Sequence, residues 1–73
     1  MDKYKLFTFH STHHAMLMEK VLKENGYGVR LIPIPRNLSA SCGLAARVSL
    51  SEFEAANELV KSSGVDVAAV YDF

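Results

Sequence analysis

Apolar and polar positions alternate at the start of the chain. In an extended chain over residues 3–9, Tyr4 and Leu6 point to one side, and Phe7 and Phe9 point to the other. Because successive side chains of a strand face opposite sides, this alternation predicts a first strand. Apolar side chains occur on both sides, so one apolar pair must lie away from any helices that cover the sheet.

The spacing of apolar residues changes to that of a helix over residues 15–25. The apolar residues that recur at this spacing are Ala15, Met18 and Leu22. Ser11 and Thr12 precede them and are candidate N-caps, and Gly26 stands just past the expected end. This segment is therefore predicted to be the first helix.

Residues 27–35 form a second predicted strand, which contains two prolines. Pro33 and Pro35 are two positions apart, so both missing N–H groups face the same side of the strand. A central strand would lose ladder hydrogen bonds there, whereas an edge strand can turn that side outward. We therefore expect this strand at an edge of its sheet.

The second half of the chain repeats the pattern. A third strand is predicted over residues 44–50, with one apolar face formed by Leu44, Ala46, Val48 and Leu50. Ser51 and Glu54 have the spacing of a capping box, which predicts a second helix that ends near Gly64. The residues expected to face the core from this helix are Phe53, Ala56, Leu59 and Val60. Residues 65–71 form a predicted fourth strand.

The predicted order is strand, helix, strand, strand, helix, strand. This is the βαββαβ order of the ferredoxin-like α+β fold, in which a four-stranded antiparallel sheet has both helices on one face. Its usual strand order places the second strand at an edge, in agreement with the prolines. We expect residues 1–73 to form a single domain.

Composition and charge exclude several classes of protein. Hydrophobic residues make up 49% of the 73 residues, which is enough for a packed core. Eight basic and eight acidic residues cancel, so we expect neither nucleic acid nor anionic lipid as a partner. No stretch approaches the roughly 20 apolar residues of a membrane span, and the first ten residues do not resemble a signal peptide. With a single cysteine, we expect a cytoplasmic protein.

Cys42 is that single cysteine, and it lies in the expected loop between the second and third strands. A lone thiol is either a small buried apolar group or a reactive one. In the ferredoxin-like topology the first two strands are parallel, so the turn at residues 10–14 and the loop at residues 36–43 should be neighbours. Cys42 would then lie near the N-terminus of the first helix, where the helix dipole stabilises a thiolate.

Residues around this position could support the thiol. The histidines near the helix start are His10, His13 and His14, and an imidazolium close to Cys42 would lower the thiol pKa. Polar or small residues of the same two segments are Ser11, Thr12, Ser39, Ser41 and Gly43. Gly43 would allow close backbone approach, and the serines offer hydroxyl donors. Arg36 and Arg47 flank the loop and could hold an anion. The alternatives are ordinary helix-start histidines and solvent-facing arginines.

The sequence has no recognisable pattern of a turnover enzyme. It contains no phosphate-binding glycine loop, no dinucleotide fingerprint and no evident third member of a hydrolytic triad. The three histidines together with Cys42 are candidate ligands for a zinc or copper ion. His13 and His14 point about 100° apart on a helix and cannot easily share one ion. We therefore expect neither a metal nor a cofactor. We expect a carrier or binding module and not a turnover enzyme.

Two segments resemble a known family. Residues 7–19 are Phe-Thr-Phe-His-Ser-Thr-His-His-Ala-Met-Leu-Met-Glu, and residues 31–45 are Leu-Ile-Pro-Ile-Pro-Arg-Asn-Leu-Ser-Ala-Ser-Cys-Gly-Leu-Ala. Both are similar to segments of the small bacterial domain named putative selenium/sulfur carrier-like. The resemblance covers almost the whole chain. The Ser-x-Ser-Cys-Gly segment is the most specific part. The better-known sulfur-relay carriers hold a Cys-Pro pair at the start of the first helix, where this chain has Ser11.

The resemblance implies that Cys42 carries sulfur or selenium as a persulfide or selenosulfide. It implies as partners a persulfide donor, such as a cysteine desulfurase, and an acceptor. Two alternatives remain. One is a small regulatory module that binds a ligand or protein, including a homodimer formed through an apolar sheet face. The other is a thiol-redox or metal sensor that uses the same loop.

Overall fold

Strands and helices follow one another in the predicted order. The computed structural model describes residues 3–34 and 43–73. The elements are β1 (Tyr4–Phe9), α1 (Thr12–Glu24), β2 (Val29–Pro33), β3 (Leu44–Ser49), the 3₁₀ helix η1 (Leu50–Glu52), α2 (Phe53–Ser62) and β4 (Val67–Asp72). No helix among the described residues has the length and apolar character needed to cross a bilayer.

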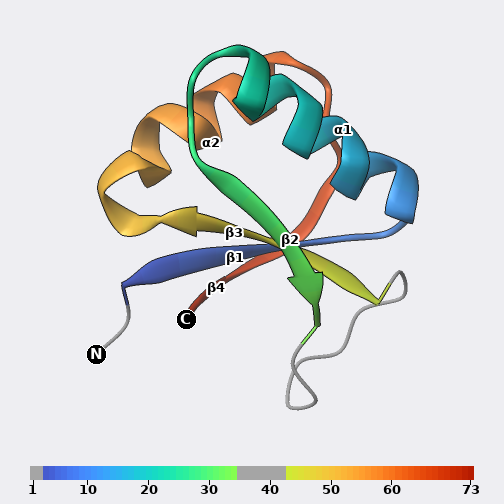
Figure 1. The fold of residues 1–73 in the computed structure, drawn as a ribbon. Coiled ribbons are helices and arrows are strands. Elements are labelled where there is room, and N and C mark those ends of the chain that lie inside the picture. The colour runs from blue at the N-terminus through green and yellow to red at the C-terminus, as the bar shows by residue number, and fades with distance from the viewer. Residues whose placement is uncertain (1–2, 35–42) are drawn as a thin grey trace.

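The strands form one antiparallel sheet in the order β2-β3-β1-β4. Figure 1 shows both helices on the same side of this sheet. The arrangement is that of a ferredoxin-like α+β fold, as predicted. Among residues 3–34 and 43–73, no helix lies on the other side of the sheet, which we call the open face (Figure 1).

The position of β2 at the edge of the sheet confirms the expectation drawn from the prolines. The N–H of Ile34 donates a hydrogen bond to the carbonyl of Gly43 at 3.1 Å, so this N–H points toward the β3 side. The nitrogen of Pro33, one residue earlier, therefore points away from β3 to the outside of the sheet. Pro35 lies outside the described residues.

The core lies between the sheet and the two helices. Phe7 and Phe9 point into it from β1, and both are fully buried. The helices contribute Ala15, Met18, Leu22, Ala56 and Val60. Phe53 and Leu59 are partly buried against this cluster, in line with the predicted inner face of the second helix.

The other apolar pair of β1, Tyr4 and Leu6, lies on the open face. Leu6 is nevertheless 0% exposed. Its neighbours across the strands are Arg47 on β3 and Tyr71 on β4. The Arg47 guanidinium lies over the ring of Tyr4, 4.2 Å from the ring centre. The open face therefore buries Leu6 within a single chain, whereas a homodimer formed through an exposed apolar face stays a prediction.

Two expectations for the second half of the chain are wrong. Leu50 does not belong to β3; it begins η1 and is 48% exposed. The capping box is also absent, because α2 starts at Phe53 after Glu52 and has no side-chain cap. The hydroxyl of Ser51 instead lies 2.9 Å from that of Ser49. The single turn of 3₁₀ helix shifts the start of α2 beyond the Ser51 position.

Candidate functional site at the end of strand β1

Strands β1 and β2 end at the same rim of the sheet. Both pair antiparallel with β3, so they are parallel to each other, as predicted. We call the rim where they end and β3 begins the β1 rim. The register of β1 and β3 runs as far as Thr8 opposite Ala45, so β3 begins at the rim where β1 ends. The start of α1 and the start of β3 therefore meet at the β1 rim (Figure 1).

The start of α1 contains no negative charge of its own. Ser11 is the N-cap residue, with φ −146° and ψ 153°, but its hydroxyl caps no backbone N–H. The first turn, which includes Thr12 and His13, has no acidic residue. The backbone N–H groups of a first helical turn have no partner within the helix, and they form its partially positive end. This end of α1 is therefore suited to stabilising an anion.

The adjacent histidines of α1 have different roles. His14 is half-buried, and its Nδ1 accepts a hydrogen bond from the backbone N–H of Asp66 at 3.1 Å. Asp66 precedes β4, which lies on the opposite side of β1 from β3. His13 is exposed, and its ring meets the ring of His14 edge-on at 5.6 Å. His14 therefore connects α1 to the β4 side, and His13 is the more accessible of the two.

Gly43 is the described residue nearest to Cys42 in the sequence. Its φ is +76°, a left-handed conformation that favours glycine. A Cβ at this position would have no heavy atom within 4 Å among the described residues. Glycine is therefore favoured here by its conformation, and a close backbone approach of the loop at Gly43 stays a prediction.

The remaining residues of the expected site lie outside the described residues. They are Arg36, Ser39, Ser41 and Cys42. Within the described part, the structure brings His10, Ser11, Thr12 and Gly43 to the β1 rim from two distant parts of the sequence. Within residues 3–34 and 43–73, no group of three or more His, Cys, Asp or Glu side chains could hold a metal ion. Ligand sets that include Cys42 fall outside that range.

Arg47 does not flank the loop as predicted. It lies within β3 and pairs across the strands with Arg30 of β2. Sequence analysis did not identify this arginine pair, because the residues are 17 positions apart and belong to different predicted strands. A signal was present: once β2 and β3 are paired as an antiparallel hairpin, their register brings both arginines together on one face.

Comparison with known proteins gives one match. The family model described as Putative Se/S carrier protein-like matches residues 3–72. No curated protein and no solved structure matches the chain. The match covers both strands and the helix start of the β1 rim, as well as the Ser-x-Ser-Cys-Gly segment that precedes β3. On this match over nearly its whole length, the chain belongs to the Putative Se/S carrier protein-like family.

Proposed function

We propose that this protein carries a sulfur or selenium atom on the thiol of Cys42, as a persulfide or selenosulfide. The observation that carries the proposal is membership of a family named for such carriage, in a chain whose one cysteine is Cys42. A single thiol can hold one chalcogen atom and cannot resolve it into an internal disulfide. The protein would act between a persulfide donor, such as a cysteine desulfurase, and an acceptor.

The transfer requires an ionised thiol. The Cys42 thiolate attacks the outer sulfur of the donor's persulfide and forms a new S–S bond. The S–S bond of the donor breaks, and its electron pair leaves on the donor thiolate. In the second step a thiolate of the acceptor attacks the outer sulfur on Cys42 and forms a new S–S bond, and Cys42 departs as a thiolate. No net oxidant or reductant is needed, because the sulfane sulfur keeps its oxidation state in both steps.

The β1 rim offers the electrostatic support that this chemistry needs. Cys42 is bonded to Gly43, the residue that directly precedes β3. β3 begins at the rim where β1 ends and leads into α1, so Gly43 lies on the rim that holds the start of α1. An uncapped helix N-terminus without acidic residues favours a thiolate and a persulfide anion. Exposed His10 and His13 would add positive charge when protonated, and Arg36 would help to dock an anionic donor.

Sulfur loading tests the proposal directly. The protein is incubated with a cysteine desulfurase and cysteine, and its intact mass is measured before and after treatment with dithiothreitol. We expect a gain of one sulfur atom that dithiothreitol removes, and no gain in Cys42→Ser. Selenocysteine in place of cysteine tests selenium in the same way. Absence of any gain with several donors would contradict carriage.

The helix N-terminus can be tested separately by charge reversal. Thr12→Glu places a carboxylate in the first turn of α1, which should raise the pKa of the Cys42 thiol and slow its alkylation at neutral pH. Ser51→Glu is the matched control, because it adds the same charge near a helix start at the opposite rim of the sheet. The alkylation rate is measured against pH for all three proteins.

We expect the unmodified protein to titrate below about 8.5, the value of a free cysteine. Thr12→Glu should move the midpoint upward, and Ser51→Glu should leave it unchanged. If both substitutions shift the midpoint equally, the inference that Cys42 lies close to the start of α1 is wrong. A midpoint at or above the free value in the unmodified protein contradicts activation of the thiol.

A further inference from the structure

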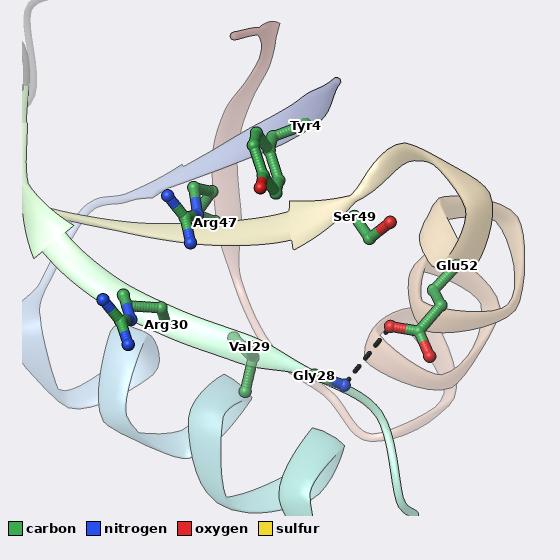
Figure 2. Close-up of a pocket in the computed structure, with 7 residues that line it drawn as sticks. All are labelled: Tyr4, Gly28, Val29, Arg30, Arg47, Ser49 and Glu52. Atoms are coloured by element: carbon green, nitrogen blue, oxygen red, sulfur yellow. Dashed lines mark hydrogen bonds between the residues drawn. The ribbon is translucent and has the colours of Figure 1, made fainter.

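A pocket on the open face, away from the β1 rim, has two arginines in its wall. It encloses about 230 Å³ and is lined by Tyr4, Gly28, Val29, Arg30, Arg47, Ser49 and Glu52. Figure 2 shows the two guanidinium groups at one end of the pocket and Glu52 at the other. The lining residues come from the start of β1, the start of β2 with the residue before it, the second half of β3, and η1. The pocket therefore extends toward the rim opposite to the β1 rim.

The arginine pair is not explained by stability. Arg30 and Arg47 are direct partners in the β2–β3 register, and like charges in this position destabilise a sheet. Neither belongs to an ion pair within residues 3–34 and 43–73, where the salt bridges are Lys5 with Asp72 and Lys23 with Glu19. Two neighbouring arginines that are not neutralised by an ion pair are a common arrangement for binding an anion.

The surrounding residues position these cations. The ring of Tyr4 lies against the Arg47 guanidinium at 4.2 Å, which restricts its motion and leaves its N–H groups able to donate. Ser49 adds a hydroxyl to the wall of the pocket. Glu52 is held at its own end of the pocket, because its Oε1 accepts a hydrogen bond from the N–H of Gly28 at 3.3 Å.

We propose that this pocket binds a small molecule through one oxyanion group, a carboxylate or a phosphate, held by Arg30 and Arg47. The volume of about 230 Å³ is below that of pockets for drug-sized ligands and suits a small metabolite. Glu52 disfavours a second negative group at the far end. This site is separate from the proposed carrier function of Cys42 and does not depend on it.

Titration with simple anions tests the proposal. Inorganic phosphate and acetate are added separately to ¹⁵N-labelled protein, in exchange for chloride at constant ionic strength, and amide shifts are followed by NMR. We expect saturable shifts at Gly28, Arg30, Arg47 and Ser49 with millimolar affinity for at least one anion. The anion that binds more tightly identifies the ligand group, as a phosphate or as a carboxylate. Absence of saturable shifts with both anions would overturn the proposal.

Substitutions in the pocket should act in opposite directions. Arg30→Gln and Arg47→Gln should each weaken binding by about tenfold or more, since each removes charge-assisted hydrogen bonds. Glu52→Gln keeps an acceptor for Gly28 but removes a negative charge, so it should strengthen binding. Lys61→Gln, on the exposed surface of α2, is the control for net charge and should change nothing. Thermal melts verify that each variant is folded. Arg47→Gln loses its contact with the Tyr4 ring and should melt slightly lower, whereas Arg30→Gln should not destabilise the sheet. Equal affinity in all variants would overturn the proposal.

Discussion

Glycines at the two ends of the β2–β3 pair show how the same residue type serves different needs. Gly43 precedes β3 and has a φ of +76°, which residues with a Cβ adopt only at a cost. Gly28 precedes β2 without a positive φ, and a Cβ there would lie 3.6 Å from Glu52 Oε1, an ordinary contact. Only Gly43 is therefore required by its backbone conformation, although the sequence alone does not distinguish the two.

Substitution by alanine should separate these glycines. Gly43→Ala should lower the free energy of unfolding by about 1 kcal/mol or more, because the left-handed conformation is strained with a Cβ. Gly28→Ala should stay within about 0.5 kcal/mol of the unmodified protein. Urea denaturation followed by circular dichroism measures both. Equal effects of the two substitutions would contradict the left-handed turn before β3.

His14 and His13 offer a similar contrast at neighbouring positions. His14→Ala removes the acceptor of the Asp66 N–H and should cost about 1 kcal/mol, with several-fold faster hydrogen exchange of the Asp66 amide. His13→Ala removes an exposed ring and should leave that amide unchanged. Exchange measured by NMR at one pH is sufficient. Unchanged exchange in His14→Ala would show that the link between α1 and β4 does not form.

At the level of elements, local signals predicted most boundaries. The two prolines of the predicted second strand identified an edge strand, because a missing N–H is a property of the residue that holds in any fold. The apolar spacing identified both helices, because the helical repeat is also a local property of the sequence. The predicted start of α2 was wrong because the Ser51 hydroxyl has another partner that competes with helix capping. Ser51 contacts Ser49 within a turn of 3₁₀ helix, and this contact depends on where β3 ends.

The absent capping box gives a prediction for α2. Ser51→Ala should lower the free energy of unfolding by less than about 0.5 kcal/mol, since no backbone N–H of α2 depends on the Ser51 side chain. A working Ser N-cap would cost about 1 kcal/mol. Thermal and urea denaturation of Ser51→Ala decide between these values. A loss near the larger value would show that the capping box forms after all.

At the scale of the whole molecule, sequence analysis predicted one rim of the sheet but not the pocket on the open face. The β1 rim followed from topology, since parallel strands end together whatever their exact register. The arginine pair required the register itself. A shift of one residue between β2 and β3 would place Arg30 and Arg47 on opposite faces. Apolar patterns identify a face of a strand, whereas pairing of polar residues across strands is known only after the sheet is assembled.

The separation of the two proposed sites yields a prediction for the whole chain. They lie toward opposite ends of β3, where Arg47 is four residues from Gly43, roughly 14 Å at about 3.4 Å per residue. A charge at that distance is strongly screened at physiological salt, where the Debye length is about 8 Å. Arg30→Gln should therefore lose phosphate or acetate binding while Cys42 still accepts sulfur at the unmodified rate. Cys42→Ser should lose sulfur loading and keep the affinity for the anion. Mass spectrometry and NMR titration of the same two variants measure both properties.

If Arg30→Gln slowed sulfur loading, the pocket would belong to the carrier reaction, as a site that docks the donor. If each variant lost only its own property, the chain would hold two independent sites, one at the β1 rim and one on the open face.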